Sequence, residues 1–70
     1  MCEHRRLSAA EANEVLNREG LKRSQVPAIF IDDPALLSIR PAVGDIIEIT
    51  RPQNGEFAEH HYYRRVVSGW

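Results

Sequence analysis

Two adjacent carboxylates, Asp32 and Asp33, are the side chains of this 70-residue sequence that most resemble a pair for acid–base catalysis or metal binding. No paired histidine or lysine and no glycine-rich phosphate loop accompanies them. Asp33 stands directly before Pro34, and Asp followed by Pro is typical of a helix start in which Asp is the N-cap. We therefore interpret Asp33 as a capping residue and Asp32 as a solvated loop residue.

A second group, one cysteine and three histidines, has the chemistry of zinc ligands: Cys2, His4, His60 and His61. The Cys-x-His spacing is tighter than that of a zinc finger, and the sequence has no Cys-x-x-Cys. A nucleophilic cysteine paired with a histidine is a further alternative, but a cysteine at the chain terminus lacks the rigid placement that such chemistry needs. The sequence therefore predicts no catalytic residue, no metal, no cofactor and no small-molecule substrate.

The segment Tyr62-Tyr63-Arg64-Arg65 interleaves aromatic and basic residues, as surfaces that bind nucleic acid do. On a strand, alternation sends Tyr63 and Arg65 to one face and Tyr62 and Arg64 to the other. Nine basic and ten acidic residues give a net charge of −1, whereas a domain that holds phosphates is normally basic. We therefore favour a packed aromatic residue on each face, beside a solvated or interface arginine.

The elements that must position these residues form one small domain, residues 1–70, with 68–70 expected as a loose tail. A core of this size supplies only about 3–5 kcal/mol of net stability, so reinforcement by a partner is expected. The single cysteine cannot form an internal disulfide, which suits a reducing compartment. No signal peptide is visible, and no apolar run is long enough to span a membrane.

A helix is predicted over residues 8–19. Ser8 and Glu11 have the spacing of a capping box, and Gly20 is placed to end the helix in the left-handed conformation. A short buried strand is predicted over residues 28–31, followed by a second, short helix that begins at Asp33-Pro34. Pro41 blocks the continuation of that helix.

A β-hairpin is predicted for the rest of the chain. Gly44 and Asp45 form a turn into a strand over residues 46–51, and the turn over residues 52–55 includes Gly55. A last strand runs from Phe57 to residues 66–67. The expected fold class is α+β: a small two-layer domain with a mixed sheet of about four strands and two helices on one face.

In this order and spacing, several short motifs are similar to a small subunit of archaeal DNA-directed RNA polymerase, the one that corresponds to the C-terminal domain of the fifth subunit of eukaryotic nuclear polymerases. The resemblance covers residues 4–67, and it is carried by Val26-Pro27-Ala28-Ile29, Asp33-Pro34, Gly44-Asp45-Ile46-Ile47, Ile49-Thr50-Arg51-Pro52, Gly55 and Tyr63-Arg64 followed by Val66-Val67.

The sequence also departs from that family. Where the family carries Arg, an aromatic residue and Gly after the Asp-Pro pair, this chain has Leu37, Ser38 and Arg40. Gln53 replaces a Ser in the hairpin turn, and extra residues stand around 59–61. The chain is therefore a divergent member, and contacts that depend on the family's arginine are not carried over.

The resemblance implies a non-catalytic assembly subunit, docked on the largest polymerase subunit beside neighbouring small subunits. From the same resemblance we expect downstream DNA nearby without a sequence-specific contact, and an archaeal-type subunit without the N-terminal jaw of the eukaryotic version. Implied interface residues are Asp33, Pro34, Arg51, Pro52, Tyr63 and Arg64. The archaeal type implies a cytoplasmic protein, and a eukaryotic or viral source a nuclear or virion-associated one. The alternative is a free-standing nucleic-acid-binding or transcription-regulator module.

Overall fold

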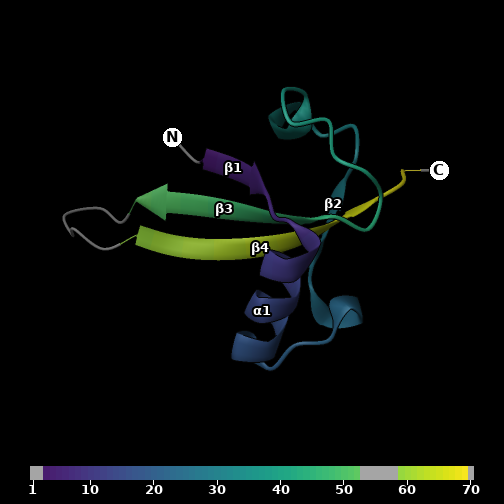
Figure 1. Cartoon of the computed structure of the whole chain (residues 1–70). Coiled ribbons are helices and arrows are strands. Elements are labelled where there is room, and N and C mark those ends of the chain that lie inside the picture. The colour runs from purple at the N-terminus through teal and green to yellow at the C-terminus, as the bar shows by residue number, and fades with distance from the viewer. Residues whose placement is uncertain (1–2, 53–58, 70) are drawn as a thin grey trace.

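The two longest strands, β3 (Ile46–Pro52) and β4 (Glu59–Val67), form an antiparallel pair that runs the length of the molecule (Figure 1). Our computed structural model describes residues 3–52 and 59–69. β-Branched residues, which favour extended backbone, are frequent in β3 and at the end of β4. The pair is therefore the axis on which the other elements are arranged.

One further strand extends the sheet at each edge. β1 (Glu3–Arg6) pairs antiparallel with β3, and β2 (Ala28–Phe30) pairs parallel with β4, in the order β1-β3-β4-β2. The predicted mixed sheet of about four strands is confirmed, and its first strand, β1, precedes the helix.

Helix α1 (Ala9–Glu19) forms where the sequence predicts it. The Glu11 N–H donates to Ser8 Oγ (3.1 Å) and the Ser8 N–H donates to Glu11 Oε1 (3.0 Å), which completes the capping box. At the other end Gly20 has φ 66°, and the Leu21 N–H donates to the Leu16 carbonyl (2.9 Å). Both ends of the helix are thus fixed by the residues that the sequence singled out.

The core is divided between the two faces of the sheet, because adjacent residues of β3 point to opposite sides. Ile46 packs toward α1, whereas Ile47 packs with Leu36 of the 3₁₀ turn η2 (Pro34–Leu36). The cluster beneath α1 comprises Leu7, Ala12, Val15, Leu16, Val26 and Ile46, with Tyr63 packed against it. The cluster beneath η2 comprises Leu36, Ile47 and Val66, with Ile29, Ile31, Ile39 and Ile49 at its margin.

The prediction of two helices on one face of the sheet is therefore wrong. The described residues form one α-helix, and the second helical segment lies on the other face. Asp33 caps the second segment as expected, accepting from the Ala35 N–H (2.9 Å), but only the 3₁₀ turn η2 follows. Arg40 then takes a left-handed conformation with φ 51°, directly before the buried Pro41. The segment is too short for an α-helix, and it packs on the face opposite α1, as Figure 1 shows.

The predicted strand over residues 28–31 exists as β2, but its predicted burial is wrong. Ala28 and Phe30 are exposed, and Ile29 is partly buried. Side chains alternate along this edge strand, so Ile29 packs against the cluster beneath η2 and its two neighbours point to the other face. The connector before it contains a second 3₁₀ turn, η1 (Arg23–Gln25).

The turn before β3 is confirmed. Gly44 has φ 96°, and Asp45 Oδ2 accepts from the Ala42 N–H (2.8 Å). The predicted hairpin turn beyond Pro52, with Gly55, lies outside the described residues, as does the predicted strand start at Phe57.

Candidate functional site

The sheet face opposite α1 is covered by η2 over only part of its length, and a shallow groove of about 200 Å³ lies on the remainder. It is lined by His4, Ile49, Arg51, Tyr62 and Arg64. The strand register explains this set, because His4 pairs with Ile49 and Ile49 pairs with Tyr62, which brings three strands together in one row. We call these five residues the sheet groove.

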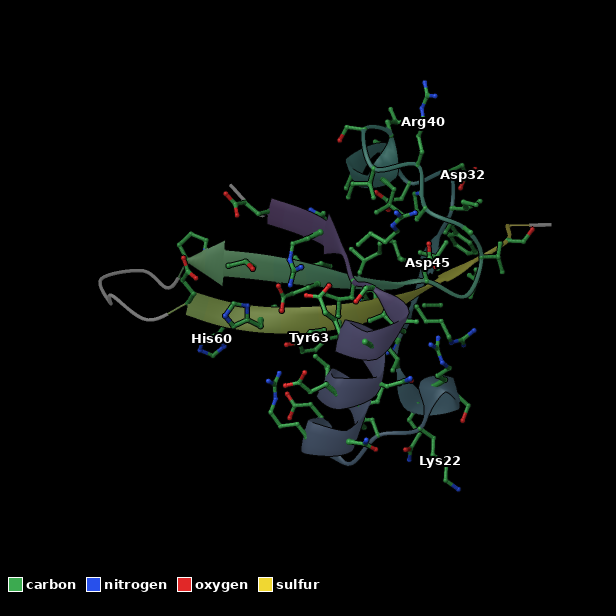
Figure 2. All side chains as sticks on the ribbon, in the orientation of Figure 1. Lys22, Asp32, Arg40, Asp45, His60 and Tyr63 are labelled. Atoms are coloured by element: carbon green, nitrogen blue, oxygen red, sulfur yellow. The ribbon has the colours of Figure 1, made fainter. Side chains whose placement is uncertain are left out.

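The sheet groove has an apolar floor and a cationic rim. The Arg51 guanidinium carbon lies 5.8 Å from the centroid of the Tyr62 ring, within the range of a cation–π interaction. The ring of His60, at the outer end of β4 in Figure 2, lies 6.0 Å from the Tyr62 ring. Arg64 donates through Nη1 to the Tyr63 carbonyl (2.9 Å), which anchors one edge of its guanidinium at the strand.

The acidic side chains of the described strands lie on one face of the sheet, whereas basic side chains lie on both. The glutamates of the described strands, Glu3, Glu48 and Glu59, alternate onto the α1 face. The strand residues on the groove face that can carry a positive charge are His4, Arg6, Arg51, His60 and Arg64. A carboxylate near them is Asp45, which precedes β3 and lies 4.0 Å from Arg6. The outer half of the groove face is therefore suited to an anionic partner.

The α1 face carries a network that joins the helix to the sheet. Tyr63 Oη accepts from Arg18 (3.2 Å) and donates to Glu48 (3.3 Å), between α1 and β4 (Figure 2). Burial raises the pKa of Tyr63, and the nearby Glu48 carboxylate raises it further. Arg5 donates to Glu11 (2.9 Å) and to Glu48 (3.2 Å). These groups satisfy one another, so their role is structural.

Two of these ion-paired groups titrate away from their ordinary values. The Ser8 backbone N–H, and then the Arg5 guanidinium, lower the pKa of Glu11. The hydrogen bonds to Glu11 and Glu48 raise the pKa of Arg5. Both side chains are about half exposed, so solvent weakens the pairing and its contribution to stability is small.

The structure brings together only part of the predicted interface. Arg51 and Arg64 lie in the sheet groove, and Pro52 continues β3 beyond Arg51. Tyr63 is half buried on the opposite face, and Asp33 and Pro34 lie at the start of η2. Sequence reasoning placed Tyr62 and Arg64 on one face, but it did not select Tyr62, Ile49 or His4 for the interface. The two-residue period of each strand gives the face on which these residues lie. The strand register is also needed to show that they are neighbours.

The histidines do not converge on one point. His4 and His60 lie on the groove face, whereas His61 lies on the other face, 3.3 Å from Thr50 Oγ1 and 3.9 Å from Glu48. Cys2 lies outside the described residues. Within residues 3–52 and 59–69, no group of three or more His, Cys, Asp or Glu side chains is arranged to hold a metal ion. The same part of the chain contains no helix with the length and apolar character to cross a bilayer.

The structure is thus that of a small α+β domain in which one face of the sheet carries an open groove lined by arginine and apolar side chains. Comparison with known proteins gives the particular family: residues 1–67 match the model of the RNA polymerase Rpb5 C-terminal domain, and the chain belongs to that family. The resemblance seen in the order of the motifs is thereby confirmed.

Individual relatives have the same assignment. The chain is 42% identical over 64 residues to DNA-directed RNA polymerase subunit Rpo5 of Nitrosopumilus maritimus, covering 91% of this chain and 76% of that one. It is 46% identical over 66 residues to the Aeropyrum pernix subunit Rpo5, covering 94% and 72%. The Thermococcus celer subunit Rpo5 is 40% identical over 65 residues, covering 93% and 77%.

Proposed function

We propose that this chain is a non-catalytic subunit of a multisubunit DNA-directed RNA polymerase, and that it docks on the largest subunit near the downstream DNA. Membership of the Rpb5 C-terminal domain family, whose matched relatives are polymerase subunits from archaea, supports the polymerase assignment. The sheet groove is the single observation that supports docking, because it leaves a basic rim and an apolar floor open on one face.

Arg51 and Arg64 form the centre of the proposed interface, with Pro52 at its outer end. Pro52 has no backbone N–H, so it limits further strand pairing there. Pro34 is exposed on η2, on the same side of the sheet, and Asp33 fixes that turn by capping it. Tyr63 contributes from the opposite face, by holding β4 against α1.

The role is assembly rather than chemistry. In this proposal the catalytic groups of the polymerase belong to its large subunits, and this chain stabilises the complex around them. Neighbouring small subunits adjoin it, and downstream DNA passes near without a sequence-specific contact. The chain accordingly resides in the cytoplasm of an archaeal-type cell, together with the polymerase.

Affinity purification of a tagged chain from its own cells, followed by mass identification of its partners, tests the proposal. We expect the large polymerase subunits in stoichiometric amounts. Arg64→Ala should reduce their recovery while leaving the melting temperature of the isolated chain close to wild type. Lys22→Ala is the matched control, because Lys22 is an exposed base beyond the end of α1, far from the groove (Figure 2). A chain recovered only as a free monomer contradicts the proposal.

The second candidate, a free-standing nucleic-acid-binding module, is favoured by the arginines and tyrosine of the sheet groove. It predicts dimerisation and salt-dependent binding of DNA by the pure chain. The net charge of −1 opposes it. A gel shift at low salt separates the two, since the assembly role requires no DNA binding by the isolated chain.

A further inference from the structure

We infer that the sheet groove receives an extended acidic segment of a partner protein, with carboxylates on both sides of one apolar side chain. This inference rests on the proposed docking function and adds the chemistry and spacing of the partner to it. Each step uses the position of a groove residue along the hairpin.

The first step is the order of side chains along the groove. On the groove face, Arg51 lies opposite His60, Ile49 lies opposite Tyr62, and Arg64 lies opposite Ile47. An apolar level therefore separates a level that carries Arg51 from a level that carries Arg64. Ile47 is fully buried beneath η2, so the groove ends at that level.

The second step is the spacing of those levels. Same-face residues of a strand recur every two residues, or about 6.6 Å, so the two arginine levels are about 13 Å apart. An extended partner segment has the same repeat, so carboxylates at its positions i and i+4 would reach the two arginines. The side chain at i+2 would then lie over Ile49 and Tyr62. A helix would need carboxylates at i and i+8 to span the same distance, because it rises only about 1.5 Å per residue, so the spacing of the acidic residues distinguishes the two forms.

The third step is charge complementarity. A guanidinium presents a planar fork that matches a carboxylate, and the rim of the groove has two of them. The strand glutamates lie on the other face, so within the described strands no carboxylate competes for these arginines from the groove face. An acidic partner fits this rim, whereas a basic one would be repelled.

The fourth step distinguishes a protein partner from a nucleic acid. Bases bind single-strand sites by stacking on free aromatic faces. Tyr62 has the Arg51 guanidinium over its ring and His60 beside it, so a stacking base would have to displace these contacts. A small acidic side chain can bind without displacing these contacts, because the Arg51 guanidinium stays over the Tyr62 ring and donates to the carboxylate.

Cross-linking inside the assembled polymerase tests the inference. In a Cys2→Ser background the chain has no other cysteine, so His60→Cys can carry a benzophenone maleimide at the groove. We expect the label to attach to a protein segment with carboxylates at i and i+4 and an apolar residue between them. Lys22→Cys is the matched control, and it should label different residues or none.

The outcomes separate the inference from the function on which it rests. Cross-links to nucleic acid, to a segment without that acidic pattern, or to nothing in an assembled polymerase overturn the inference and leave the subunit assignment intact. If neither the labelled variant nor the unlabelled wild-type chain enters the polymerase, both the inference and the proposed function are overturned.

Charge reversal provides a second, independent readout. Arg64→Glu and Arg51→Glu should each lower recovery of the polymerase about tenfold or more, because a carboxylate then faces a carboxylate. Lys22→Glu makes the same charge change outside the groove and should leave recovery unchanged. Arg51 is exposed, so its variant keeps the test valid if Arg64→Glu impairs folding. Equal recovery of all three variants overturns the inference.

Discussion

Replacing Arg40 with glycine should stabilise this domain. Among the described residues, Arg40 is the one non-glycine residue with a positive φ, 51°, and its backbone N–H donates to the Leu36 carbonyl (3.1 Å). Its side chain projects away from the molecule (Figure 2) and makes no hydrogen bond or ion pair with any other part that the structure describes. The family resemblance places a glycine at this position, so the arginine is a departure with a conformational cost.

The magnitude follows from two opposing terms. A left-handed conformation costs an L-residue about 1–2 kcal/mol, because its Cβ approaches a carbonyl oxygen. Glycine removes that cost but adds about 0.5–1 kcal/mol of chain entropy to the unfolded state. The net gain in the free energy of unfolding is therefore about 0.5–1 kcal/mol. For a domain of this size, that gain raises the melting temperature by about 2–8 °C.

Thermal unfolding followed by circular dichroism measures this shift. Arg40→Ala is the control, because alanine removes the guanidinium and retains the Cβ that causes the strain. We expect the free energy of unfolding of Arg40→Ala to lie within about 0.5 kcal/mol of that of wild type, as is usual for surface substitutions. If alanine stabilises as much as glycine, the gain comes from removing the charge and the reasoning from backbone conformation is refuted. An unchanged melting temperature in Arg40→Gly refutes it as well.

Two further predictions concern the turn before β3 and the start of α1. Gly44→Val should lower stability by about 1–3 kcal/mol, because Gly44 has φ 96° and a β-branched residue resists that conformation. A Cβ there would meet no atom within 4 Å, so Gly44→Ala should be destabilising for the same backbone reason, and a wild-type melting temperature in both would contradict it. The pKa of Glu11 is lowered in the folded state, so its charged carboxylate stabilises the fold fully above the ordinary pKa of 4.5. This stabilisation is lost as the pH falls through the lower pKa of the folded state. Denaturant unfolding of wild type and Glu11→Gln across acid pH should show their difference shrinking as the pH falls, and a constant difference would exclude a role for the charge.

The parts of the fold that could be predicted from the sequence depend on local chemistry. Ser8, Glu11 and Gly20 fix the ends of α1 through hydrogen bonds and a backbone angle that involve only neighbours in the chain. Gly44 and Asp45 fix a turn in the same way. The second helix was predicted from an equally good start at Asp33, but a cap does not set the length of a helix. Packing of Leu36 against the sheet, together with the early reversal at Arg40, ended that segment after one turn.

The side on which each helical segment packs could not be predicted, because β3 has apolar residues on both faces. Ile46 and Ile47 are equally suited to burial, and both are in fact buried, beneath different elements. A pattern of strict alternation would have indicated one covered face and one wet face. Apolar residues on both faces instead indicate that each face is covered for part of its length.

The sheet groove follows from the same division, and it depends on register as well as on alternation. Tyr62 and Arg64 share a face in any register, but only the pairing of Tyr62 with Ile49 places them over an apolar residue and beside Arg51. A shift of one residue would set Tyr62 opposite Glu48, give Arg64 an internal carboxylate neighbour and leave Arg51 on the other face. The groove remains open to an outside anion because the register directs Glu48 to α1, where Tyr63 and Arg5 occupy it. The hydrogen bonds that attach α1 to the sheet thus hold Glu48 on the α1 face. The arginines on the opposite face remain available to bind a partner.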